Sequence, residues 1–367
     1  MNVRPAIEAR EPMNAGSPMS TRRAMKARRS DRWCLAVLFL LMIATAIASI
    51  RYGAMDFSVH DMAAAAWGKF SGRIDLPLEQ RIFMELRVPR AILCLLVGAS
   101  LGVGGTLMQA LFRNPIVEPG LVGTSSGAAF GAALFYVFGA LLKINLGEWT
   151  LPIAACAGGV LSTYAVFALA HTRNEGRSSI LRLLLTGLAI NALFMSGIGF
   201  LSYVARDPAA RSIIYWNLGT LSGANWNSVL VVGLATLVGL VPAIVLAKPL
   251  NALMIGEDEA VALGVNVRRL KWTVLTINVV MVAVATAFTG VISFVGLIVP
   301  HILRIVRGPD NRFLILGSAL LGGILLSVAD LIARVSLRPA ELPIGIVTAV
   351  VGVPVFLSLL RSRDYLS

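Results

Sequence analysis

Apolar segments about as long as a lipid bilayer is thick recur along the whole of this 367-residue chain. About 20 helical residues cross a hydrocarbon core about 30 Å thick, because each residue of an α-helix rises about 1.5 Å. We therefore predict an all-α, polytopic membrane protein with about ten transmembrane helices. The ten candidate spans are Arg32–Arg51, Val88–Leu111, Pro119–Leu142, Trp149–His171, Ile180–Val204, Trp226–Ala247, Arg269–Gly290, Phe294–Val306, Asn311–Ser336 and Pro343–Arg361. The eighth is short and contains Pro300, which indicates a partial or tilted span.

The composition supports a membrane location. Hydrophobic residues make up 57% of the chain and charged residues 14%, against about 25% charged in a soluble domain. This balance excludes a soluble enzyme, a disordered regulator and a conventional nucleic-acid binder. The net charge of +13 does not indicate DNA binding, because the basic residues form short clusters between apolar runs, as membrane orientation signals do. The partner that the composition implies is a lipid bilayer.

The distribution of basic residues predicts the orientation. If the ten spans alternate in direction, 21 Lys and Arg residues fall on the side of the N-terminus and 11 on the other side. The positive-inside rule therefore places both termini in the cytoplasm. The outward segment Arg51–Arg90 is unusually basic for its side.

The first 31 residues read as a basic cytoplasmic tail without packed structure, rich in arginine and proline. An alternative interpretation is a secretory signal peptide cleaved near Ala44-Thr45-Ala46. The apolar run that follows is about 18 residues long, which favours a retained spanning helix. We therefore divide the chain into a tail, 1–31, and a ten-helix transmembrane domain, 32–367.

The spans carry few ionisable groups. The clearest is Asp330, which has Arg334 one helical turn later and can pair with it. A proton- or sodium-driven transporter usually needs more polar machinery inside the membrane. The sequence also lacks a G-x-x-x-x-G-K-[ST] phosphate loop, so ATP hydrolysis by that route requires another chain. We expect a non-catalytic permease subunit.

Several segments together resemble the permeases of ATP-binding-cassette (ABC) importers for cobalamin, haem and iron-siderophores, the FecCD or BtuC-like family. The resemblance covers nearly everything after the tail. The segments are Leu86–Arg90, Leu96–Ser100, Met108–Pro115, Glu118–Gly123, Tyr215–Gly219, Leu253–Gly264, Phe294–Ile302 and Ala329–Gly345.

The resemblance implies a BtuC-like type II importer in a bacterial inner membrane. Its expected parts are a homodimer of ten-helix permeases, two ATPase subunits that use ATP and Mg, and a periplasmic substrate-binding protein. The segment Asp207–Ser212, which leads into Tyr215–Thr220, is most similar to the haem branch. Siderophore and cobalamin remain alternative cargoes. A self-sufficient secondary transporter is the alternative from a different class.

Residues 248–268 form the predicted cytoplasmic connection between the sixth and seventh spans. Three acids open its central part, Gly256–Gly264, and suit the positive end of a short helix dipole. Taken alone, this is an ordinary connection. The resemblance implies instead a coupling helix that contacts the ATPase, with Gly256, Glu257, Leu263 and Gly264 at that interface.

Three arginines are expected at the outward ends of spans: Arg87, Arg90 and Arg334. One interpretation is that they are anchors at the membrane surface. The resemblance implies that they dock the binding protein by pairing with its glutamates. Arg334 has a competing partner in Asp330.

Four further residues match the positions that close the cytoplasmic mouth in the family: Asn114, Ile116, Ile180 and Leu181. Apolar side chains facing each other across a dimer axis would exclude water there. The alternative is that Ile180 and Leu181 simply begin a buried helix.

No bound cofactor or metal is expected. Haem is often held by histidine, but His60, His171 and His301 show no ligand pattern, and His301 belongs to a motif shared with permeases of other cargoes. The three cysteines lack the paired spacing of a disulfide framework or zinc site.

Two glycine pairs predict close helix packing. Gly98 with Gly102, and Gly127 with Gly131, each lie four residues apart, on one helix face. Such pairs allow helix backbones to approach closely in a membrane.

Overall fold

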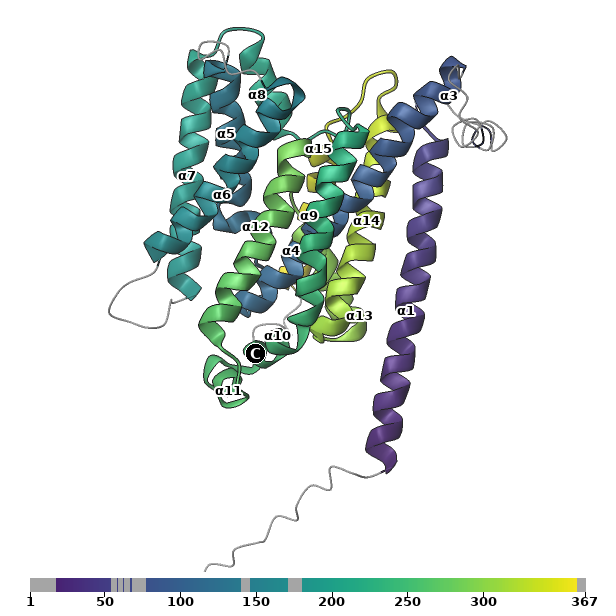
Figure 1. Ribbon diagram of the computed structural model, residues 1–367, viewed down its shortest axis with the longest axis vertical. Helices are drawn as coiled ribbons and strands as arrows, with labels where there is room; N and C mark the ends of the chain where they lie inside the picture. The colour runs from purple at the N-terminus through teal and green to yellow at the C-terminus, as the bar shows by residue number, and fades with distance from the viewer. Residues whose placement is uncertain are drawn as a thin grey trace, which may run out of the picture.

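The chain forms a bundle of helices whose long members run between the same two ends (Figure 1). The computed structural model describes residues 18–53, 58, 62, 67, 77–139, 146–170 and 180–361. The long helices are α1 (Pro18–Arg51), α4 (Val88–Phe112), α5 (Thr124–Phe138), α6 (Thr150–Ala170), α7 (Ile180–Val204), α9 (Trp226–Val245), α12 (Val267–Thr289), α13 (Val295–Arg307), α14 (Asn311–Ser336) and α15 (Ile344–Arg361). Each of the ten predicted spans overlaps one of them. The all-α, multi-span fold is thus confirmed.

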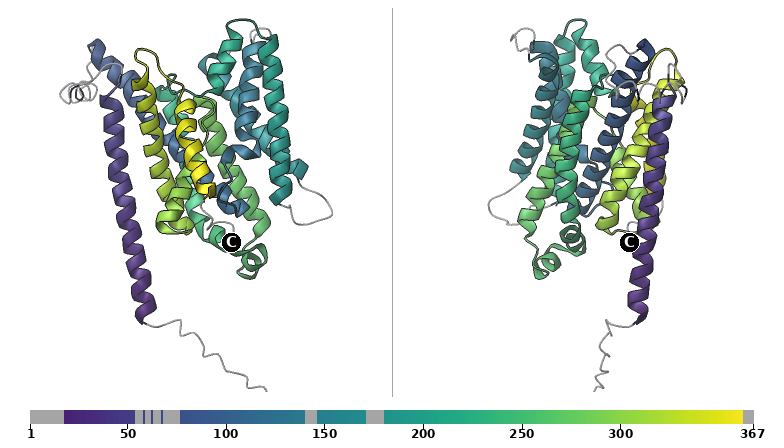
Figure 2. Two further views of the ribbon diagram at one scale, coloured as in Figure 1. Left: turned by 180° about the vertical axis from the view of Figure 1, so that it is seen from behind. Right: turned by 45° about the vertical axis from the view of Figure 1, so that its right-hand side comes forward.

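Shorter helices connect the long ones. At one end of the bundle lie α3 (Leu78–Ile82), the π-helical turn η1 (Phe83–Arg87) and α8 (Ala209–Asn217). At the opposite end lie α10 (Ala247–Ile255) and α11 (Glu257–Ala262). We call these the α3 end and the α11 end. The chain enters α1 and leaves α15 at the α11 end (Figures 1 and 2).

Among the described residues, seven helices are long and apolar enough to cross a membrane by themselves. The helices α5 and α15 are shorter, and α13 has 13 residues, as expected for the short eighth span. Helix α5 begins later than predicted. Gly123 adopts a left-handed φ of 87° and separates the 3-10 turn η2 (Pro119–Val122) from α5.

Helix α1 lies at the edge of the bundle (Figure 2). It begins at Pro18, so residues 18–31 are helical where we predicted an unstructured tail. Its apolar stretch is only 11% buried, whereas that of the central helix pair α3–α4 is 78% buried. Arginines hold α1 at two levels: Arg307 of α13 donates to Asp31 (2.6 Å) and Arg334 of α14 donates to the Ser49 carbonyl oxygen (2.9 Å).

Glycines mark the closest helix crossings, as the sequence predicted. A methyl group on Gly98 of α4 would overlap the Gly322 carbonyl oxygen of α14. A methyl group on Gly127 of α5 would likewise overlap the Gly158 carbonyl oxygen of α6. The α4–α14 and α5–α6 contacts are therefore backbone against backbone, the arrangement that small residues permit in membranes.

A buried amide supports the start of α13. Pro300 lacks an N–H, so the Gly296 carbonyl oxygen cannot form its usual helical hydrogen bond. The side chain of Gln109 on α4, which is fully buried, donates to the carbonyl oxygens of Gly296 (3.4 Å) and Leu297 (3.2 Å). Helix α4 thus supplies the bond that the proline removes.

Candidate functional site

Charged side chains converge at the α3 end of α4 and α14. We call this group the charge cluster; its members are Arg87, Arg90, Asp330, Arg334 and Glu341. Arg90 donates to Asp330 Oδ1 from Nη2 (2.8 Å) and Nε (3.1 Å). Its Nη1 donates to Glu341 Oε2 at 2.9 Å. On the other side of Asp330, the Arg334 Nε lies 2.9 Å from Oδ2. One arginine therefore links two carboxylates, and one carboxylate links two arginines.

Arg334 is an internal residue. Its side chain is 2% exposed and donates to the carbonyl oxygens of Ser49 (2.9 Å) and Tyr52 (3.1 Å). Carbonyl groups in the last turn of a helix lack partners within the helix, so Arg334 caps the end of α1. We predicted from the sequence that Arg334 docks the binding protein; the structure shows its partners inside the chain, and the docking role stays a prediction.

Arg87 and Arg90 lie next to the π-helical turn η1. The two residues are three positions apart, so they share a helix face. The guanidinium of Arg87 covers Gly53, just beyond the end of α1, at a place where even a methyl group would overlap it. Arg87 is half-buried, and the side chain of Arg90 is 14% exposed. Both are thus nearer to the surface than Arg334.

At the α11 end, Glu257 has a partner inside the chain. It opens α11, and one of its carboxylate oxygens lies 2.8 Å from Nζ of Lys271 in α12. Both side chains are largely shielded, at 22% and 17% exposed. The ion pair fixes the orientation of α11 relative to α12.

Three apolar side chains of this segment are exposed, next to the exposed acids Asp258 and Glu259. Ile255, Val261 and Leu263 are 71%, 60% and 67% exposed. The chain then turns at Gly264, whose φ of +82° favours glycine and whose missing side chain faces open space. Exposed apolar groups on a short polar connection are typical of a surface that contacts another protein.

Hydrogen bonds also join α10 to α14. The Asn251 side chain donates to Asp310 at 2.7 Å and accepts from the backbone N–H of Asn311 at 2.9 Å. Leu250 and Leu253 of α10 are fully buried in the core. The α10–α11 segment is therefore attached to two spanning helices, α12 and α14.

Two of the four predicted gate residues, Asn114 and Ile116, occupy a tight turn after α4. Arg113 ends α4 in a left-handed conformation (φ 50°). Asn114 then accepts a hydrogen bond from the backbone N–H of Ile116 at 3.0 Å, which leaves the Ile116 side chain 39% exposed. The side chains of Ile180 and Leu181 lie outside the described residues, so the closure predicted between the two pairs stays a prediction.

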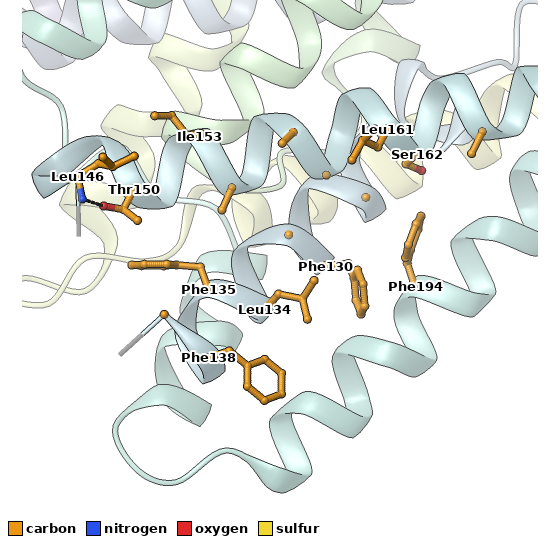
Figure 3. A pocket seen from close by; sticks show the side chains of 17 residues that line it. Phe130, Leu134, Phe135, Phe138, Leu146, Thr150, Ile153, Leu161, Ser162 and Phe194 are labelled. Carbon is orange, nitrogen blue, oxygen red and sulfur yellow. Dashed lines mark hydrogen bonds between the residues drawn. The ribbon is translucent and has the colours of Figure 1, made fainter. Parts of the chain in front are cut away.

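Residues of α5 and α6 line an apolar groove of about 650 Å³ (Figure 3). Phe130, Leu134 and Phe138 line one side, and Phe194 of α7 lies at its margin. All 17 residues that line the groove are uncharged. Among the described residues, the groove therefore offers no charged group that would bind a metal or an ionised cargo.

Within the described residues, no group of three or more His, Cys, Asp or Glu side chains is arranged to hold a metal. His301 lies in α13 and is 7% exposed. His60 and His171 fall outside the described part of the chain. Cys94 is buried, whereas Cys34 and Cys156 are partly buried; all three are free thiols.

The sequence reading missed Glu341 and Lys271. Glu341 stands within the resembling segment that ends at Gly345, but nothing in its spacing reveals that Arg90, 251 positions earlier, is its partner. Lys271 lies 14 residues after Glu257. The available signal was an acid before a turn, followed by a lysine near the start of the next helix.

The long apolar helices are those of a multi-pass membrane protein. The charge cluster lies at one end of its bundle, and the α10–α11 segment lies at the other. Residues 40–362 match the FecCD transport family, and the chain belongs to that family. This confirms the resemblance and identifies the chain as a permease subunit of an ABC importer.

The chain is similar to several characterised members over most of its length. It is 37% identical over 341 residues to the hemin transport system permease protein HmuU of Yersinia pestis, covering 93% of this chain and 99% of the relative. It is 41% identical over 285 residues to the cobalamin import system permease protein BtuC of Halobacterium salinarum, covering 78% and 74%. A metal-chelate type ABC transporter, solved in an inward-facing conformation, matches with a TM-score of 0.77 and 32% identity, covering 89% of this chain and 98% of that one.

Proposed function

We propose that this permease moves haem, or a closely related metal chelate, from a periplasmic substrate-binding protein into the cytoplasm. The observation that carries the proposal is the likeness to the hemin permease, which extends over 99% of that relative. The segment Asp207–Ser212, which we identified as haem-like from the sequence, agrees with it. A siderophore is the next cargo that the family name suggests.

Cobalamin is the third candidate cargo, after haem and a siderophore. The cobalamin permease of Halobacterium salinarum is 41% identical, although over a shorter stretch of 285 residues. Identity over the whole chain cannot separate the two cargoes, because most matched residues build the helix bundle. Direct competition between the two cargoes is therefore required.

The proposed assembly contains two copies of this chain, two ATPase subunits and one binding protein in the inner membrane. The α11 end would face the cytoplasm, which the excess of basic residues on that side supports. Ile255, Val261 and Leu263 would then contact the ATPase, and Glu257 would orient α11 through Lys271. Arg87 and Arg90 would meet the binding protein at the α3 end. ATP and Mg would be used only by the partner ATPase, and the permease itself would hold no cofactor.

The test is transport by the reconstituted complex. The permease and its partner ATPase are placed in proteoliposomes with the binding protein outside, and uptake of hemin, a ferric siderophore and cyanocobalamin is measured in parallel. We expect ATP-dependent uptake of hemin that excess cobalamin does not inhibit. Preferential uptake of cobalamin would reassign the cargo. Uptake that persists with an ATPase lacking its phosphate-loop lysine would contradict the ABC mechanism and favour a secondary transporter.

A further inference from the structure

The two acids of the charge cluster differ in burial. Asp330 is 1% exposed and lies within α14. Glu341 is 39% exposed and lies in the non-helical segment between α14 and α15. One acid is therefore fixed and enclosed, whereas the other is accessible to solvent and to a partner.

Arg90 connects the two acids. Its Nε and Nη2 face Asp330, and its Nη1 faces both oxygens of Glu341, at 2.9 and 3.0 Å. Removing one partner of an enclosed pair leaves an uncompensated charge, so the Asp330 side of this arrangement is strongly held. Ion pairs near water contribute little, because solvent competes with both groups. The ion pair of Arg90 with Glu341 is therefore weaker than that of Arg90 with Asp330.

We propose that Glu341 is a stand-in ligand for Arg90, and that an acidic side chain of the substrate-binding protein displaces it on docking. The inference rests on the proposed function, because it takes the α3 end as the docking surface. A carboxylate can accept charge-assisted hydrogen bonds from Nη1 of Arg90, as both oxygens of Glu341 do in the undocked chain.

The exchange gives the cluster a role in regulation. Before docking, Glu341 shields Arg90 from other anions at the membrane surface. On docking, Glu341 is released, and it lies three residues before Ile344, where α15 begins. The backbone that follows it is anchored: Leu342 donates to the Ala333 carbonyl oxygen at 3.0 Å, and Gly345 to that of Leu218 at 3.0 Å. Displacement therefore moves one side chain and leaves the start of α15 in place.

Glu341→Gln is the direct test, because it removes the competing charge and keeps the size of the side chain. The full complex is placed in nanodiscs of zwitterionic lipid, so that no anionic headgroup competes, and its affinity for the loaded binding protein is measured. We expect tighter binding by about two- to fivefold at low salt, the range that an exposed ion pair is worth. The gain should shrink as salt is added, because screening shortens the reach of the released charge.

Two further variants separate displacement from a general effect of charge. Glu85→Gln is the matched control: Glu85 also lies at the α3 end, is half exposed and pairs with Arg81 at 3.8 Å. It changes the net charge equally and should leave the affinity nearly unchanged. In an Arg90→Gln background, Glu341→Gln should no longer tighten binding, because the group that it releases is gone.

The outcomes distinguish this inference from the proposed function. If Glu341→Gln leaves binding unchanged or weakens it, whereas Arg87→Glu weakens binding, Glu341 is not a stand-in and the docking surface stands. An equal gain from Glu85→Gln overturns the displacement in favour of a general field. If neither Arg87→Glu nor Glu341→Gln alters binding at any salt concentration, both the inference and the docking surface are wrong.

Discussion

Gln109 and Pro300 compensate each other across the contact between α4 and α13. The proline withholds the N–H that the Gly296 carbonyl oxygen would accept, and the amide of Gln109 donates there instead, at 3.4 Å. Gln109→Leu should therefore leave a buried carbonyl group unpaired and lower the free energy of unfolding by about 1–3 kcal/mol. Pro300→Ala restores an N–H and should recover part of that loss. Thermal unfolding of the four members of the double-mutant cycle measures the coupling; strictly additive effects would contradict the pairing.

The crossing of α4 and α14 depends on the absence of side chains at Gly98. Gly98→Leu should push the helices apart, because even a methyl group would overlap the Gly322 carbonyl oxygen. We expect a loss of at least about 1–3 kcal/mol, seen as a lower yield of monodisperse protein. Gly199→Leu is the control, since that position on α7 is exposed and faces open space. Equal yields from the two variants would argue against this contact.

The ion pair of Glu257 with Lys271 should couple α11 to α12. Glu257→Lys places two cations together at a site where the native groups are 2.8 Å apart. Transport per ATP hydrolysed should fall while the permease still folds. The reversed pair, Glu257→Lys with Lys271→Glu, should regain most of the coupling. If the double variant is no better than the single one, Glu257 acts by contacting the ATPase and not through Lys271.

Substitution of Gly264 by a residue with a side chain should be unfavourable because of the backbone conformation at this position, and not because of crowding. Its φ of +82° is rarely adopted by residues with a side chain, and nothing lies within 4 Å of the position. Gly264→Val should shift the turn after α11 and reduce coupling. Gly264→Asn, which tolerates a left-handed backbone better, should be milder. The ratio of transport to ATP hydrolysis is the measurement, and equal effects of Val and Asn would contradict this account.

Replacement of Arg334 should lower the free energy of unfolding more than it affects docking. Arg334→Leu removes the cap from α1 and one cation from Asp330, and breaking a buried pair costs about 3–5 kcal/mol. Arg338→Leu, four residues further on and exposed, should have little effect on unfolding. A variant of Arg334 that unfolds normally but no longer binds the substrate-binding protein would support the docking role predicted from the sequence.

The sequence predicted the helices well because the bilayer sets their length. Every predicted span overlaps a helix, and the short α13 was expected from its length and from Pro300. The start of α5 was not foreseen, since it depends on the left-handed conformation of Gly123. The helical residues 18–31 were also missed, because their composition alone indicated a solvated tail.

The sequence predicted at which end of the bundle the site residues lie, but not which residues they contact. Arg87, Arg90 and Arg334 do lie at one end of the bundle, and Gly256–Gly264 lies at the other. No feature of the sequence around Arg334 indicates that it is buried, because its partner Ser49 is 285 positions away. Contacts of this kind arise only when α1 and α14 pack side by side, so residue types and spacing do not reveal them.

The two arginine contacts to α1 are spaced along the helix by about the thickness of a membrane. Asp31 and Ser49, the residues held by Arg307 and Arg334, are separated by 18 positions of one helix, or about 27 Å of rise. That is close to the thickness of a bilayer's hydrocarbon core. The spacing of the two contacts along α1 thus corresponds to one crossing of the hydrocarbon core, with Arg307 partly exposed and Arg334 enclosed by protein. A thicker bilayer would have to thin locally around α1 or pull against both arginines, which makes membrane thickness a physical variable for this permease.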